Sequence, residues 1–137
     1  MIVDTSALLA FFDARDPAHS LLAELFSTPH PALVVSPFVV AELGYLVLTR
    51  FGVHAELQTL GELTAGAWEL AVITPAMLRE AVALVANYGD SKIGITDAVN
   101  VVLAQEYQTQ NIATLDRLHY GYVRRPDGQH LIILPEY

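Results

Sequence analysis

Short apolar runs along the chain alternate with longer segments in which apolar residues recur every three or four positions. Short continuous apolar runs are typical of buried strands, whereas the wider spacing is typical of amphipathic helices. Strands are predicted at residues 2–3, 33–35, 70–73, 111–115 and 131–134. Helices are predicted at residues 7–12, 21–26, 37–50, 54–67, 75–85 and 95–106. Strands that alternate with helices predict an α/β fold, with a mostly parallel sheet of about five strands and helices on both faces.

Three dipeptides mark expected helix starts in this pattern. Each consists of a short polar residue followed by proline: Asp16-Pro17, Ser36-Pro37 and Thr74-Pro75. The polar side chain can accept a hydrogen bond from a free backbone N–H, and proline suits the first helical position. We therefore expect a capped helix after each pair.

The composition is that of one soluble globular unit. The chain has 137 residues, of which 53% are apolar and 16% charged, and we expect residues 1–137 to form a single domain. The longest segment without a charged side chain, residues 25–41, contains three prolines, so no membrane-spanning helix is expected. The absence of cysteine excludes disulfides and thiolate metal sites. With no basic, apolar leader at the N-terminus, we expect a cytoplasmic protein.

The charge balance is strongly acidic. Fifteen acidic residues against seven basic ones give a formal net charge of -8. Nonspecific binding to nucleic acid depends on Lys and Arg, so the overall charge does not favour it. Any chemistry on phosphate groups would need bound cations.

Two acids stand where a parallel sheet binds ligands. Asp4 and Asp116 each follow an apolar strand candidate directly. In open α/β sheets, ligands bind beyond the carboxyl ends of the strands. This position favours a functional site that contains both carboxylates.

Two further acids lie on helix candidates in apolar surroundings. The residues three and four positions from Glu42 are Phe, Val, Tyr and Leu, so we expect this face of the helix to turn toward the core. Asp97 lies in the first turn of its helix, close after Ile93 and Ile95. A buried carboxylate must be paired, protonated or bound to a metal.

The sequence offers these acids few basic partners. No Lys or Arg lies within four residues of Asp4, Glu42 or Asp97. A divalent cation such as Mg2+ or Mn2+ would neutralise them with the oxygen ligands that it prefers. Taken singly, each acid could instead be a cap, a turn residue, a first-turn helix acid or a neutral core group.

The segments around the four acids resemble a known family. They read Met-Ile-Val-Asp4-Thr5-Ser6, Val-Val-Ala-Glu42-Leu-Gly-Tyr45, Gly-Ile-Thr96-Asp97-Ala98 and Ala-Thr114-Leu-Asp116-Arg117. In this order and at these separations they resemble the PIN-domain ribonucleases, in particular the VapC toxins of bacterial VapBC toxin–antitoxin pairs. The likeness extends over nearly the whole chain.

The resemblance implies a three-layer α/β/α PIN-like sandwich and a metal-dependent endoribonuclease that hydrolyses RNA. It implies Mg2+ or Mn2+ as cofactor, a VapB-type antitoxin as partner, and four catalytic, metal-binding acids: Asp4, Glu42, Asp97 and Asp116. Hydroxyl and amide groups nearby would support these ligands: Thr5, Ser6, Asn100 and Thr114. The many apolar helix positions also predict a homodimer.

Other functions remain open at this stage. A haloacid-dehalogenase-type phosphatase would carry a second aspartate two residues after the first, and Ser6 at that position argues against it. A PIN-like nuclease that acts on DNA or structured nucleic acid and a catalytically inactive PIN-like binding module are both alternatives.

Several polar residues outside the four acids have open roles. The five histidines show no metal-ligand spacing, although His119 follows Asp116 closely and could contact RNA phosphate. The basic stretch that holds Arg117, Arg124 and Arg125 could guide RNA, meet an antitoxin or form a solvated loop. Asp90 could reach the site or serve only in a turn.

Overall fold

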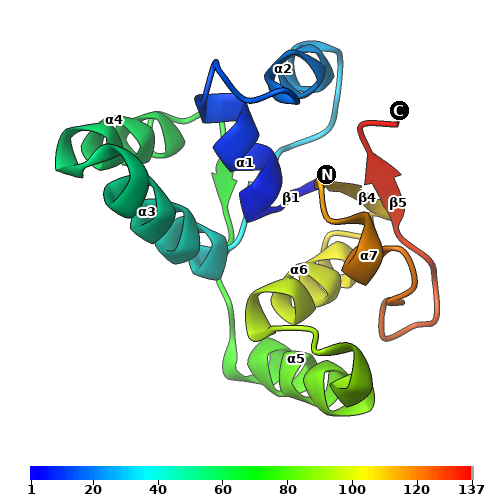
Figure 1. Ribbon diagram of the computed structural model, residues 1–137. Coiled ribbons are helices and arrows are strands. Elements are labelled where there is room, and N and C mark those ends of the chain that lie inside the picture. Colours follow the sequence, from blue (N-terminus) through cyan, green and yellow to red (C-terminus); the bar gives the residue numbers. More distant parts are fainter. Residues whose placement is uncertain (137) are drawn as a thin grey trace.

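The computed structural model describes residues 1–136 and has the expected alternation of strands and helices (Figure 1). The strands are β1 (Ile2–Val3), β2 (Val34–Val35), β3 (Glu69–Leu70), β4 (Asn111–Ala113) and β5 (Ile132–Leu134). The helices are α1 (Thr5–Phe12), α2 (His19–Ser27), α3 (Pro37–Phe51), α4 (Val53–Leu63), α5 (Pro75–Asn87), α6 (Ile95–Glu106) and α7 (Arg117–Tyr120). A 3-10 turn, η1 (Gly89–Ser91), precedes α6.

The five strands form one parallel sheet with the order β3-β2-β1-β4-β5. β1 lies at the centre, where Ile2 is in register with Val34 of β2 and with Ile112 of β4. Val3 is in register with Ala113, so β1 and β4 end side by side. The predicted parallel sheet is confirmed, and its central carboxyl ends belong to β1 and β4.

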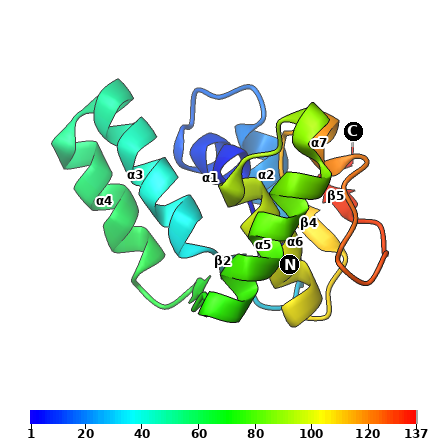
Figure 2. The same ribbon diagram turned by 90° about the horizontal axis from the view of Figure 1, so that it is seen from below.

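Alternate side chains of the strands divide the interior into two cores. Ile2 packs in the core that α5 and α6 cover, whereas Val3 packs in the core that α1, α2, α3 and α4 cover. This division follows from the two-residue period of a strand. Figures 1 and 2 show the two groups of helices on opposite sides of the sheet, with α3 and α4 side by side as a pair. The expected three-layer arrangement is confirmed.

Two of the three expected helix caps are present. The side chains of Ser36 and Thr74 accept hydrogen bonds from first-turn N–H groups of α3 and α5, at 3.0 and 3.2 Å. The prediction for Asp16 is wrong, because α2 begins only at His19. Asp16 instead accepts a hydrogen bond from the backbone N–H of Ala18 at 2.8 Å, and so it belongs to the turn before the helix.

The third strand also differs from its prediction. The sequence predicts a strand over residues 70–73, but β3 comprises only Glu69–Leu70, and both residues are exposed. Val72 is 80% exposed. β3 is an edge strand with a single neighbour, and an apolar run does not reveal whether helices will cover it. Within residues 1–136, no helix has the length and apolar character that crossing a membrane requires.

Candidate metal site

Asp4 lies at the central carboxyl edge of the sheet. It follows β1 and precedes the first residue of α1, and its backbone N–H donates to the carbonyl oxygen of Ala113 at 2.9 Å. Because β1 and β4 end together, Asp4 lies beside Thr114, the residue after β4. The Asp4 side chain is buried, with only 5% of the residue exposed. The sequence-predicted position of this acid is therefore correct.

Four side-chain donors surround the Asp4 carboxylate. Oδ2 accepts hydrogen bonds from Ser6 Oγ and Thr114 Oγ1, both at 2.9 Å. Oδ1 lies within hydrogen-bonding distance of Asn100 Nδ2, at 3.2 Å, and of the Tyr120 hydroxyl, at 3.3 Å. Polar groups, rather than Lys or Arg, thus stabilise this buried carboxylate. Ser6, Asn100 and Thr114 contact Asp4 as expected, and Tyr120 was not anticipated.

Asp97 is the second acid of the site, in the first turn of α6. Its Oδ1 accepts a hydrogen bond from the Tyr120 hydroxyl at 3.0 Å, so Tyr120 lies between Asp97 and Asp4. Burial raises the pKa of Asp97, and the negative charge of Asp4 raises it further, while the Tyr120 hydrogen bond partly opposes the shift. Added positive charge near Asp97 would be stabilising.

Asp116 is held by the short helix that follows it. Its Oδ1 accepts the backbone N–H of His119 at 3.0 Å, and its Oδ2 contacts His119 Nδ1 at 2.8 Å. The hydrogen bond with Asp116 raises the pKa of His119, and burial of the ring partly opposes this rise. One potential ligand atom from each of Asp97, Asp116 and His119 lies within 4.8 Å of the others. We call these three residues the acid–histidine group.

His119 is a site residue that the sequence reasoning placed only as a possible RNA contact. Its partners are carboxylates and not other histidines, so a search for histidine spacing does not find it. The available signal was its position three residues after Asp116, which becomes one turn of a helix in α7.

Glu42 does not lie where the apolar spacing predicted. The residue is exposed on α3, and it is not part of the acid–histidine group. The core-facing side of α3 carries Val39, Leu43 and Val47, whereas Tyr45, near Glu42 on the helix, is 65% exposed. The expectation of a core-facing Glu42 is therefore wrong. α3 packs mainly on α1 and α4, so part of its apolar surface stays open to solvent.

The donors at this edge of the sheet fit a hard divalent cation. Oxygen atoms of Asp4, Asp97 and Asp116 predominate, and within residues 1–136 no Lys or Arg forms an ion pair with any of them. Two buried side-chain oxygens, Thr5 Oγ1 and Asn100 Oδ1, have no hydrogen-bond partner in the described part of the chain. Thr5 follows Asp4 in the sequence, and Asn100 donates a hydrogen bond to Asp4. Carboxylate and other oxygen donors are the ligands that Mg2+ and Mn2+ prefer.

Two arginines of the basic stretch hydrogen-bond to backbone carbonyls of their own chain. Arg125 is only 8% exposed; it donates to the carbonyl oxygen of Thr109 at 3.0 Å and pairs with Asp127. Arg117 donates to the carbonyl oxygen of Pro135 at 2.6 Å. Of the roles left open for this stretch, an exposed RNA or antitoxin contact does not fit Arg125, because it is buried in contacts with its own chain, whereas Arg124 is exposed. Asp90 lies exposed in η1.

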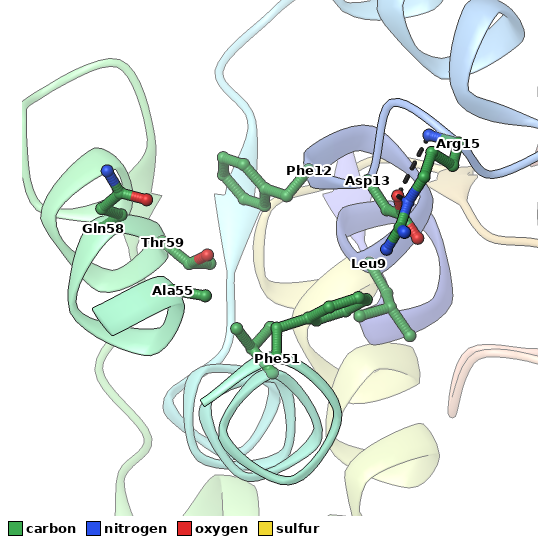
Figure 3. Close-up of a pocket in the computed structure, with 9 residues that line it drawn as sticks. Leu9, Phe12, Asp13, Arg15, Phe51, Ala55, Gln58 and Thr59 are labelled. Atoms are coloured by element: carbon green, nitrogen blue, oxygen red, sulfur yellow. Dashed lines mark hydrogen bonds and ion pairs between the residues drawn. The ribbon is translucent and has the colours of Figure 1, made fainter. Parts of the chain in front are cut away.

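A groove lies at the opposite end of α1 from Asp4 (Figure 3). α1, the turn after it, the end of α3 and the start of α4 contribute its lining: Leu9, Phe12, Asp13, Arg15, Val47, Phe51, Ala55, Gln58 and Thr59. The Arg15 guanidinium lies 5.7 Å from the centre of the Phe51 ring and 3.5 Å from Asp13. Asp13 is the one carboxylate among the lining residues, and Arg15 neutralises it. This groove is consequently suited to apolar groups and not to a divalent cation.

Comparison with known proteins gives one consistent family. The model of the PIN domain matches residues 1–122. Ribonuclease VapC26 of Mycobacterium tuberculosis is 53% identical over 135 residues, which cover 98% of this chain and 100% of that protein.

Solved structures share the fold at low sequence identity. The sarcin-ricin-loop-cleaving toxin VapC20 of M. tuberculosis is 19% identical, with a TM-score of 0.80. The match covers 88% of this chain and 92% of the VapC20 chain. A toxin–antitoxin complex from Klebsiella pneumoniae contains a chain that is 18% identical with a TM-score of 0.72, covering 99% and 97% respectively. The match of the PIN model and the close VapC relative agree with the parallel sheet and its acidic edge. The chain therefore belongs to the PIN-domain family, within its VapC branch.

Proposed function

We propose that this protein is a divalent-metal-dependent endoribonuclease that hydrolyses RNA phosphodiester bonds, and that it is the toxin of a VapBC-type pair. The main support is the gathering of Asp4, Asp97 and Asp116 at the carboxyl ends of β1 and β4, without Lys or Arg partners among residues 1–136. The 53% identity to a named ribonuclease supports RNA, and not DNA, as the substrate.

The proposed ligands differ in how firmly hydrogen bonds fix their carboxylates. Asp4 and Asp116 are each fixed through both oxygens, by polar donors and by His119 respectively. Among the side chains of residues 1–136, Tyr120 is the one that hydrogen-bonds to Asp97. Glu42 stays in the proposed set because its motif supports it, and its side chain is exposed. The bound cation, Mg2+ or Mn2+, would supply the positive charge that activates water and stabilises the transition state at phosphorus.

Removal of divalent metal is expected to abolish RNA cleavage. EDTA should reduce cleavage of single-stranded RNA by at least about 100-fold, and excess Mg2+ or Mn2+ should restore it, because the proposed reaction depends on the cation to activate water and to stabilise the charge at phosphorus. Fluorescent RNA and DNA oligonucleotides of one sequence provide the assay. Cleavage that persists in EDTA would contradict metal dependence, preferential DNA cleavage would support the DNA alternative, and no cleavage of either would support an inactive module.

We also propose a VapB-type antitoxin as the partner, with the groove of Figure 3 as its docking site. Apolar side chains from α1, α3 and α4 form much of the lining, and such surfaces are typical of peptide binding. One of the similar solved structures is a toxin–antitoxin complex, which supports a partner of this kind.

Ala55→Arg is expected to weaken antitoxin binding at least about tenfold, because the long charged side chain would occupy the groove. Leu57→Arg is the matched control, since Leu57 lies on the same helix, is exposed and is not a lining residue. Calorimetry with the cognate antitoxin measures the difference, and RNA cleavage by the free protein should be unchanged in both variants. Equal binding by the two variants would place the antitoxin elsewhere.

Three further expectations stay predictions. A homodimer has a suitable surface in the exposed apolar residues of α5, Leu78 and Val82. We propose one domain for residues 1–137, because β5 extends the same sheet as β1. A cytoplasmic location agrees with a chain that lacks cysteine.

A further inference from the structure

The Tyr120 hydroxyl is the point where Asp4 and Asp97 meet. Tyr120 is 1% exposed, and its oxygen lies 3.0 Å from Asp97 Oδ1 and 3.3 Å from Asp4 Oδ1. Asn100 Nδ2 lies 3.1 Å from the same oxygen and donates to it. A single buried hydroxyl therefore connects the carboxylate that follows β1 with one from the first turn of α6.

The number of hydrogens on Tyr120 and Asn100 determines which hydrogen bonds can form around the Tyr120 hydroxyl. A tyrosine hydroxyl carries one hydrogen, so it can donate fully to only one carboxylate at a time. The shorter distance favours Asp97. Asn100 donates one hydrogen to Tyr120 and the other to Asp4 Oδ1. With the Tyr120 hydrogen directed at Asp97, Asp4 Oδ1 keeps a lone pair that a cation can use.

The position of Tyr120 is fixed by the packing of its ring and by the short helix that carries it. Its ring belongs to the core that α5 and α6 cover. Asp116 caps α7 at one end, and Gly121 ends it at the other. A Cβ atom at Gly121 would lie 2.4 Å from the carbonyl oxygen of Arg117, so only glycine permits this tight turn. The hydroxyl is thus held at one place before any ligand binds.

We propose that Tyr120 is a positioning residue of the metal site: its hydroxyl, oriented by Asn100, holds Asp97 at a set distance from Asp4 and leaves Asp4 Oδ1 able to bind a cation. This inference rests on the proposed function, since it concerns the same site. Groups that orient metal ligands in this way typically change metal affinity by about 10–100-fold when they are lost.

Tyr120→Phe tests the proposal, because phenylalanine keeps the ring in the core and removes only the hydroxyl. We expect the variant to fold and to bind Mn2+ at least about tenfold more weakly than the wild type in calorimetric titration of the metal alone. Tyr122→Phe removes an exposed hydroxyl two residues away and should leave the affinity unchanged. Equal Mn2+ affinity of Tyr120→Phe and wild type would overturn the role of Tyr120 while leaving the proposed nuclease intact. Absence of Mn2+ binding by the wild type would overturn the metal site itself.

A second measurement needs no variant of Tyr120. In wild-type protein labelled with 3-fluorotyrosine, the 19F resonance of Tyr120 should shift when Mg2+ is added, because its hydrogen bonds to Asp97 and Asp4 change. Assignment follows by substituting the other five tyrosines one at a time with phenylalanine. A Tyr120 resonance that stays fixed at saturating Mg2+, while the metal demonstrably binds, would contradict the proposal.

Discussion

Asp97→Asn is expected to abolish cleavage and, at the same time, to stabilise the metal-free protein at pH 7. Loss of a charged ligand should reduce RNA cleavage by at least about 100-fold. Even mutation of a residue that only orients a metal ligand lowers metal affinity or activity by about 10–100-fold. The asparagine Oδ1 can still accept the Tyr120 hydrogen bond, so the local structure is retained.

The stability gain follows from the raised pKa of Asp97. Burial and the charge of Asp4 favour the protonated carboxyl in the folded state over the unfolded one. The corresponding stability is complete below the ordinary value of 3.8 and is lost as the pH rises through the raised pKa of the folded state. Asparagine does not ionise, so the variant avoids this loss at pH 7.

Thermal unfolding in EDTA measures this effect. We expect the Tm of Asp97→Asn to exceed that of the wild type by a few degrees at pH 7, the scale of shift that about 1 kcal/mol produces. The difference should vanish near pH 4. Asp90→Asn, an exposed aspartate in η1, is the control and should change neither the Tm nor cleavage. A variant with normal Mn2+ binding and RNA cleavage would contradict the role of Asp97 as a ligand.

Asp4→Asn is expected to have the opposite effect on stability. Ser6, Thr114 and Asn100 donate hydrogen bonds to the two oxygens of Asp4, and an amide replaces one of those oxygens with an NH2 group. The Ser6 and Thr114 hydroxyls can turn to accept from the NH2 group, but the hydrogen bonds that they donated to a charged carboxylate are lost, at about 1.5–3 kcal/mol each. We therefore expect the free energy of unfolding to fall by about 2–4 kcal/mol, together with loss of cleavage.

Urea denaturation, followed by circular dichroism, gives this free energy. The control is Asp13→Asn at the far end of α1, where the side chain is partly exposed and the cost should stay below about 1 kcal/mol. If Asp4→Asn and Asp13→Asn were equally stable, the hydrogen bonds around Asp4 would not carry the energy assigned to them.

Much of the fold could be predicted because local pattern and tertiary structure agree. The two-residue run of β1 is apolar on both faces, as expected for a central parallel strand, and Ser36 and Thr74 cap their helices. The prediction for β3 is wrong because an apolar run occurs both in strands that helices cover and in edge strands that stay exposed to solvent. Its position at the edge of the sheet is decided by topology.

The site was predicted to the extent that it depends on strand ends. Asp4 and Asp116 follow strands of a parallel sheet, and that placement is readable from sequence. Tyr120 and His119 were missed as parts of the site because α7 is four residues long, too short for any period to show. Glu42 was expected to face the core because helical spacing identifies neighbours but not which of two apolar faces is covered.

The distances in sequence between Asp4 and its donors affect when the site can exist during synthesis. Asn100, Thr114 and Tyr120 follow Asp4 by 96, 110 and 116 residues. A growing chain carries Asp4 from its first residues but cannot surround it until translation has passed Tyr120. Contacts of such long range also slow folding. The surroundings of Asp4 are therefore complete only when nearly the whole chain has been synthesised.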